Sequence, residues 1–290
     1  MPSRERRPRR RVTGRRAALT VLAATVVALA ACTGSAPASP RAGRTSPAGA
    51  HTATQSSSPS PTKSLTALQK LVTKLPVFPA APKPIPVHIT AGSSAPIFYH
   101  LPVTSKVAFL TIDDGIVQMP DDLTVMHAAH IPFTMFLIAP VAARNPSFFK
   151  KLAADGGVIE DHTLTHPILR GRTEDFQEHE ICGGRTMLTH TFGRAPALFR
   201  PPFGDYDQTT LRVVHNCGLT AAFYWSETVR NGKVFYQTSN HKIKPGDIIL
   251  MHFRSTFPAD VLAALTAIHK AGLTPALLED YITPPAPPRP

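Results

Sequence analysis

Apolar runs and helical stretches alternate along the chain from about residue 95 onward. Between most of the apolar runs lie helical patterns, at 148–155, 174–192, 208–216 and 259–271, while 226–246 has none. The apolar runs themselves are short and continuous, as in strands buried on both faces, and occur near 107–112, 133–138, 157–160, 197–200, 220–225, 247–252 and 274–278. This order predicts an α/β domain with a parallel sheet, open or closed, whose functional residues lie at the carboxyl ends of the strands.

The first 63 residues have a different pattern. Residues 1–16 are rich in arginine, and residues 17–31 are apolar and uncharged. Fifteen residues are fewer than the ~20 that a spanning helix needs, so 1–31 is predicted to be a secretory signal. The segment ends in Leu29-Ala30-Ala31-Cys32, which resembles a bacterial lipobox and implies lipidation of Cys32. We therefore expect a lipoprotein on the outer face of the cytoplasmic membrane. An uncleaved anchor and plain secretion are the alternatives.

The remaining segments outside the main domain are short. Residues 32–63 consist mainly of Ser, Thr, Pro, Ala and Gly and are expected to form a disordered tether. Residues 64–94 are predicted to form a helix and an extended arm before a domain at 95–283, followed by a Pro-rich tail at 284–290. The apolar face of this helix, expected within 64–78, would carry Leu65, Leu68, Leu71, Val72 and Leu75.

Charge and motifs exclude several functions. The formal net charge is +12, but eight arginines and one glutamate within 1–16 supply most of it. We therefore assign the basic character to targeting and expect no nucleic-acid partner. The chain has no phosphate-binding glycine loop and no nucleophilic serine motif, which argues against nucleotide and acyl-serine chemistry.

Residues that can bind metal or transfer protons follow several of the predicted strands. Taken singly, each has a simpler interpretation, such as a turn, a buried core histidine or a surface arginine. Two histidines four residues apart lie on one side of a helical turn, and with one carboxylate they form a common zinc site. The residues concerned are Asp113, Asp114, His162, His166, Arg200 and His252.

Four segments, taken together, resemble a known family. Residues 111–115 (TIDDG), 162–166 (HTLTH), 200–204 (RPPFG) and 250–252 (LMH) resemble, in order, the motifs of the polysaccharide deacetylases, the NodB-like carbohydrate esterases of family 4. The resemblance spans about 105–280. It implies a distorted (β/α)7 barrel of the NodB-homology type, which agrees with the seven predicted strands.

The resemblance also implies roles for single residues. Asp114, His162 and His166 would hold a divalent metal, most often Zn²⁺, with Co²⁺, Ni²⁺ or Mn²⁺ as alternatives. The other implied roles are a general base at Asp113, an orienting partner at Arg200, a proton donor at His252, an oxyanion-binding amide at Phe203 and an apolar wall at Trp225.

One motif departs from the family pattern. The family has a Trp-containing stretch with an Asp that pairs with the catalytic histidine, whereas residues 225–231 here read WSETVRN. Glu227 is the candidate replacement for that acid partner.

The resulting functional hypothesis is a hydrolase that removes N-acetyl groups from acetamido sugars of an extracellular glycan such as peptidoglycan or chitin. A wall-binding lipoprotein with little catalysis and an O-acetyl esterase are the alternatives. We expect a monomer, although the sequence leaves the oligomeric state open. Cys182 and Cys217 are the only cysteines besides Cys32, and outside the cytoplasm they favour a disulfide.

Overall fold

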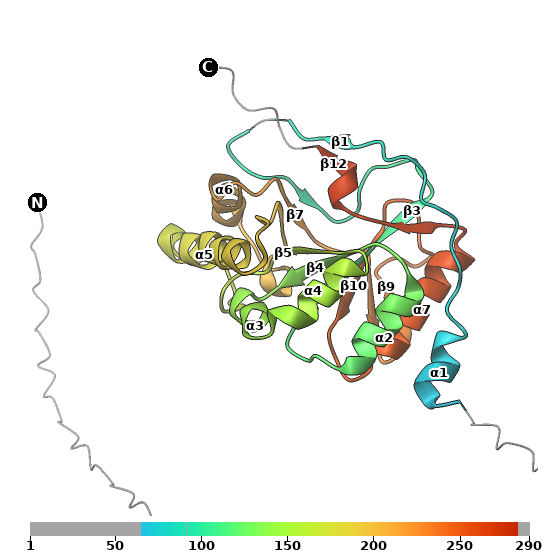
Figure 1. The fold of residues 1–290 in the computed structure, drawn as a ribbon. Helices are drawn as coiled ribbons and strands as arrows, with labels where there is room; N and C mark the ends of the chain where they lie inside the picture. The colour runs from blue at the N-terminus through green and yellow to red at the C-terminus, as the bar shows by residue number, and fades with distance from the viewer. Residues whose placement is uncertain (1–64, 91, 284–290) are drawn as a thin grey trace, which may run out of the picture. The chain divides into compact units, whose positions relative to one another are not determined.

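The computed structural model describes residues 65–90 and 92–283 (Figure 1). The predicted signal segment 1–31, the tether 32–63 with Cys32, and the tail 284–290 lie outside these residues. Within the described part of the chain, no helix is both long enough and apolar enough to cross a membrane.

A curled, mostly parallel sheet forms the centre of the domain (Figure 1). Only the β8–β9 pair is antiparallel, and β11 (Thr274–Ala276) pairs with β3 beside the main path. From one edge to the other, the strands are β2 (Ile97–Phe98), β7 (Ala221–Phe223), β6 (Leu198–Phe199), β5 (Gly157–Asp161), β4 (Phe133–Leu137), β3 (Val107–Asp114), β10 (Ile248–His252), β8 (Glu227–Arg230) and β9 (Lys233–Tyr236).

All seven predicted strands are present in this sheet, as β3, β4, β5, β6, β7, β10 and β11. Strands β3 and β4 are buried on both faces, as their continuous apolar sequences predict. The sheet has edges at β2 and β9, so it forms a half-barrel. A separate parallel pair joins β1 (Val87–His88) to β12 (Ile282–Thr283).

Helices cover the outer surface of the sheet. Helix α2 contacts both α7 and α4, α4 contacts α5, and α5 contacts α6, so the helices form one continuous row along the sheet (Figure 1). The side chains of Thr173 and Asp207 cap α5 and α6, the helices predicted at 174–192 and 208–216. The helices are α2 (Pro120–Ala129), α3 (Ala139–Arg144), α4 (Pro146–Ala154), α5 (Glu174–Phe192), α6 (Gln208–Asn216) and α7 (Phe257–Lys270), with 3-10 turns η1 (Pro202–Gly204) and η2 (Glu279–Tyr281).

The predicted helix within 64–78 is shorter than expected. Helix α1 spans only Ala67–Val72, between a capping box at Thr66 and a C-cap at Thr73. Pro76 disfavours helical geometry at the residue before it, which limits the helix on that side. Leu71 and Leu75 still pack against the core, whereas Leu65 is half exposed.

The connection 226–246 contains a β-hairpin that the strand prediction missed. Strands β8 and β9 are joined by Asn231 and Gly232, with φ values of 53° and 69°. Positive φ at both central residues is typical of a type I′ turn, which Asn-Gly favours strongly. The Asn-Gly pair was therefore the available sequence signal. The hairpin matters because β8 forms one wall of the site described next.

A disulfide joins Cys182 in α5 to Cys217 at the end of α6, with 5.1 Å between the Cα atoms. Cys217 belongs to the apolar cluster between these helices and strands β6 and β7. The structure thus contains the covalent link that the cysteine count favours.

Candidate metal-binding and catalytic site

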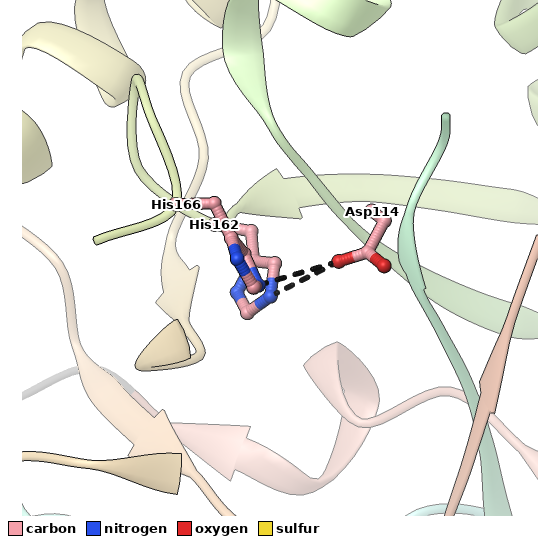
Figure 2. Close-up of side chains that lie close together, drawn as sticks. All are labelled: Asp114, His162 and His166. Carbon is pink, nitrogen blue, oxygen red and sulfur yellow. Dashed lines mark ion pairs between the residues drawn. The ribbon is translucent and has the colours of Figure 1, made fainter. Parts of the chain in front are cut away.

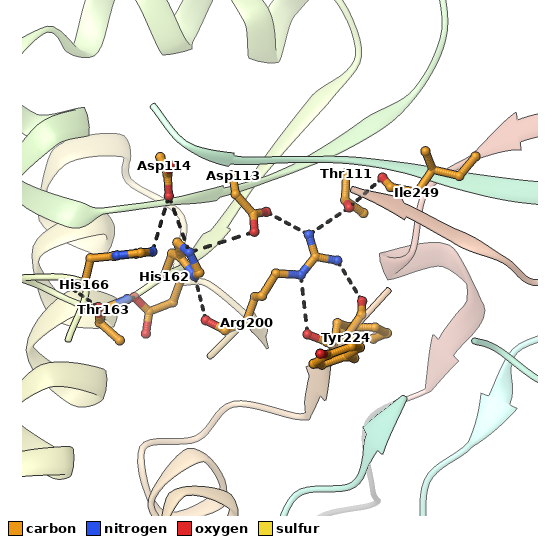
Figure 3. Close-up of polar contacts among 11 residues, drawn as sticks. Thr111, Asp113, Asp114, His162, Thr163, His166, Arg200, Tyr224 and Ile249 are labelled. Atoms are coloured by element: carbon orange, nitrogen blue, oxygen red, sulfur yellow. Dashed lines mark hydrogen bonds and ion pairs between the residues drawn. The ribbon is translucent and has the colours of Figure 1, made fainter. Parts of the chain in front are cut away.

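The carboxyl ends of the parallel strands place the predicted site residues together (Figure 3). Asp113 lies opposite His252 in the pairing of β3 with β10. His162 follows the last residue of β5, and Arg200 follows the last residue of β6. Residues separated by more than a hundred positions in the chain therefore meet at one edge of the sheet.

Asp114, His162 and His166 form the candidate metal site (Figure 2). One ligand atom from each lies within 4.8 Å of the others. Oδ1 of Asp114 is 3.6 Å from Nε2 of His162 and 3.4 Å from Nε2 of His166. The same Oδ1 atom is buried and has no hydrogen-bond partner. A buried carboxylate oxygen facing two imidazoles is what an Asp-His-His metal site requires.

The two histidines do not lie on a helical turn, so that part of the sequence prediction is wrong. They belong to a loop in which Thr163 and His166 have positive φ values, 70° and 58°. Asp161 Oδ1 accepts a hydrogen bond from the Thr163 amide, and Thr163 Oγ1 accepts one from the His166 amide. These local bonds compensate the unusual backbone and turn both rings toward Asp114.

The protonation state of His162 suits a metal ligand. Burial lowers the pKa of His162 to about 3, so its imidazole is neutral. Its Nδ1 lies 2.6 Å from the carbonyl oxygen of Arg200 and donates to it. The lone pair of Nε2 consequently points toward Asp114, which is the arrangement that a second hydrogen bond imposes on metal-binding histidines.

Asp113 is held by Arg200 (Figure 3). The guanidinium Nη1 donates to Asp113 Oδ1 at 2.7 Å and to Thr111 Oγ1 at 2.8 Å, while Nη2 donates to the carbonyl of Tyr224 at 3.0 Å. Arg200 is fully buried and also lies over the ring of Phe136. Burial lowers the pKa of Arg200 and the Asp113 charge opposes that shift, so the two groups form a buried ion pair.

A cavity of about 490 Å³ opens over these residues. Trp225 lines it and stacks on Tyr224 with 4.1 Å between ring centroids. The exposed ring of Phe203 lies 4.6 Å from the His166 ring. Of the predicted site residues, the cavity is lined by Asp113, Asp114, His162, His166, Phe203, Trp225 and His252.

Glu227 is not the acid partner of His252, and that prediction is wrong. Glu227 pairs with Ile249 in the β8–β10 register, three positions before His252 along β10. It does not line the cavity, and burial followed by the Asp247 charge raises its pKa to about 8. Burial lowers the pKa of His252, and the negative charge of Asp113 opposes that shift.

Two charged cavity residues, Arg230 and Arg254, were not predicted from the sequence. Arg254 lies two positions after His252, at the carboxyl end of a strand. Functional residues are expected at such ends, so the position of Arg254 indicates a role in the site. Arg230 is the last residue of β8, in the β8–β9 hairpin, and lines the cavity. No sequence signal identifies Arg230 without the hairpin.

Comparison with known proteins agrees with this geometry. The polysaccharide deacetylase family model matches residues 100–222. An uncharacterized protein of Streptomyces coelicolor is 35% identical over 64% of this chain and 77% of its own length. A peptidoglycan-N-acetylglucosamine deacetylase of Bacillus cereus is 26% identical over 59% of this chain and 84% of its own length.

The fold also matches solved structures. A family 4 carbohydrate esterase pseudoenzyme from Bacillus anthracis superposes with a TM-score of 0.56 at 17% identity, covering 66% of this chain and 70% of the other. This likeness supports the predicted NodB-type fold, whose barrel is open in this structure. With the ordered motifs, the strand-end cluster and the sequence relatives in agreement, the chain belongs to the polysaccharide deacetylase family.

Proposed function

We propose that this protein is a metal-dependent deacetylase that removes N-acetyl groups from acetamido sugars of an extracellular polysaccharide, such as peptidoglycan or a chitin-like glycan. The observation that carries the proposal is the convergence of Asp114, His162 and His166 beside the Asp113–Arg200 ion pair. The Bacillus cereus relative is a peptidoglycan-N-acetylglucosamine deacetylase, which supports an amino-sugar substrate.

Asp114, His162 and His166 would hold the metal, and Zn²⁺ fits two neutral imidazoles and one carboxylate. Co²⁺, Ni²⁺ or Mn²⁺ would suit the same donors. A bound divalent ion supplies Lewis acidity, which lowers the pKa of water and polarises the acetyl carbonyl.

Asp113 is proposed to be the general base that takes a proton from the attacking water. Its Oδ1 is bound to Arg200, and its Oδ2 lies 3.8 Å from Nε2 of His162, so the carboxylate faces the metal ligands. The buried guanidinium holds this carboxylate in one orientation.

His252 is proposed to donate a proton to the amine that leaves. It lines the same cavity, opposite Asp113 in the strand register. The backbone amide of Phe203 would stabilise the oxyanion of the tetrahedral intermediate. Trp225 would form an apolar wall for the acetyl group or the sugar ring.

The test is acetate release by the purified protein from N-acetylglucosamine oligomers and from peptidoglycan, with metal analysis of the same sample. We expect release that a chelator stops and that added Zn²⁺ restores. If no acetylated glycan yields acetate while the protein contains stoichiometric metal, the proposal is refuted.

A second candidate is a glycan-binding protein with little catalysis. The observation in its favour is that the family's Asp partner is missing and that Glu227 does not replace it. This candidate predicts glycan binding without acetate release. An O-acetyl esterase would instead release acetate only from O-acetylated sugars.

For the location of the protein, we propose a monomeric lipoprotein on the outer face of the cytoplasmic membrane, anchored through Cys32. The apolar segment 17–31 and the lipobox-like residues support this. Metabolic labelling with a fatty acid, lost in Cys32→Ala, would test it, and a labelled variant would contradict it.

A further inference from the structure

We infer that Arg230 and Arg254 bind a carboxylate of the glycan, so that the enzyme selects acidic acetamido polysaccharides over neutral ones. This inference rests on the proposed function and specifies its substrate class. Both arginines line the catalytic cavity, and both side chains are exposed to solvent.

The arginines have no acid to neutralise them. In the described part of the chain, no carboxylate lies within ion-pair distance of Arg230 or Arg254, although five other acidic residues have arginine or histidine partners outside the metal cluster. The only acids that line the cavity are Asp113 and Asp114. Asp113 is paired with Arg200, and Asp114 faces His162 and His166.

Each arginine is placed by a rigid element. The guanidinium of Arg230 lies over the ring of Phe235, 4.7 Å from its centroid, across the β8–β9 hairpin. Such a cation–π contact positions the charge without cancelling it. Arg254 lies two residues after His252, the last residue of β10.

Arg254 lies close enough to affect the reacting groups. It lines the same cavity as Asp113, Asp114 and His252. A substrate whose acetyl group reaches Asp113 would therefore place neighbouring substituents near this cationic rim. A planar guanidinium pairs with a carboxylate through two hydrogen bonds, which a neutral sugar substituent does not offer.

Two sources would present this chemistry. The carboxylate belongs either to the reacting sugar itself, as in N-acetylmuramic acid, or to the neighbouring sugar, as in a glycan alternating with uronic acid. Binding of N-acetylmuramic acid and of hyaluronan oligomers, each compared with neutral N-acetylglucosamine compounds, distinguishes the two.

The first experiment measures binding. Trp225 is the only tryptophan of the chain and lines the cavity, so its fluorescence reports occupancy directly. We expect one acidic ligand to bind at least about tenfold more tightly than its neutral counterpart, since a bond to a charged group contributes about 1.5–3 kcal/mol. That preference should shrink as salt rises.

The second experiment uses variants. Arg230→Gln and Arg254→Gln should each reduce the acidic-over-neutral preference several-fold in Kd, and in KM for polymer substrates, whereas Arg254→Lys should restore part of it. Arg172→Gln is the matched control, because Arg172 also lies over a phenylalanine ring but outside the cavity. Circular dichroism would confirm that each variant is folded.

The outcomes separate this inference from the proposed function. Equal binding of acidic and neutral ligands by the unmodified protein, or a preference that survives both Gln substitutions, would overturn the role of the arginines while leaving deacetylation intact. If no glycan yields acetate, the proposed function is refuted. The fluorescence measurement would still test whether the cavity binds a carboxylate.

Discussion

Asp113 and Asp114 are neighbours in sequence but have different surroundings. Asp113 continues the β3 strand and pairs with Arg200. Asp114 has a φ of 73°, outside the extended region, and its carboxylate faces the two imidazoles (Figure 2). The backbone change between the two residues is what allows adjacent acids to have separate chemical roles.

Asp113→Asn tests the proposed base. The amide keeps the shape of the side chain but accepts no proton at neutral pH, so kcat should fall about 10³-fold while bound metal is retained. Acetate release and metal content would be measured on the same protein. Asp121→Asn, in the first turn of α2 and outside the cavity, is the control. Near-normal turnover of Asp113→Asn would contradict the assignment.

Glu227 provides a prediction for stability against pH. Burial, followed by Asp247, raises its pKa from 4.5 to about 8, and Lys244 opposes the shift only weakly. The folded state then binds more protons than the unfolded state between these values. The free energy of unfolding therefore falls as pH rises from about 4.5 to about 8.

Glu227→Gln should remove this fall in the free energy of unfolding, because glutamine does not ionise. We expect the variant to gain on the order of 2 kcal/mol relative to the unmodified protein between pH 5 and pH 9, measured by urea denaturation. Glu178→Gln, on an exposed part of α5, should show no such gain. Parallel pH profiles for Glu227→Gln and the unmodified protein would show that Glu227 is ionised in the folded state.

At the scale of elements, the site depends on short irregular segments more than on long helices. The His162–His166 loop, the η1 turn and the β8–β9 hairpin all have positive φ values at key residues. The strands bring these segments to one edge of the sheet, and the segments themselves set the direction of each side chain.

The η1 turn can be tested at Gly204. Its φ is 69°, and a Cβ atom there would overlap the ring of Tyr224, which stacks on Trp225. Gly204→Ala should displace the Phe203 peptide and lower kcat about tenfold or more, because an oxyanion donor works only when correctly placed.

Gly193→Ala is the matched control for this substitution. Gly193 has a φ of 76° but nothing within 4 Å of a new Cβ atom, so it carries the backbone cost alone, about 1 kcal/mol. Stability by urea denaturation and acetate release would be measured for both variants. Equal kcat values for the two would show that overlap with Tyr224 is unimportant.

At the scale of the whole molecule, the disulfide links two helices that follow different site motifs. Cys182 and Cys217 are 35 residues apart in sequence, and neither lines the catalytic cavity. Replacing both by Ser should lower the free energy of unfolding by about 2–4 kcal/mol, since the open loop gains entropy when unfolded.

Urea denaturation of the Cys182→Ser/Cys217→Ser variant would measure that loss. The unmodified protein in reducing agent should match the variant, because reduction removes the same link. A variant as stable as the oxidised protein would show that packing of α5 on α6 suffices without the bond.

Most of the architecture was predictable because a short, continuous apolar run is typical of a parallel strand buried on both faces. All seven runs form strands, and the helices predicted at 174–192 and 208–216 begin after N-caps at Thr173 and Asp207. Helices α2 and α3 were not predicted, the helix before Pro76 is shorter than predicted, and the hairpin around Asn231 was missed. At the hairpin, the Asn231-Gly232 pair is itself a sequence signal for the turn.

The sequence by itself determined the family and which predicted strands the motif residues follow. Both depend only on the motifs and on the pattern of apolar residues along the chain. Tertiary structure alone decided which side chains meet. It placed Glu227 beside Asp247, opposite Ile249 and away from His252, and it brought Arg230 and Arg254 into the cavity. The physical reason is that strand register and the sign of φ at single residues set the direction of each side chain. Local composition determines neither of them.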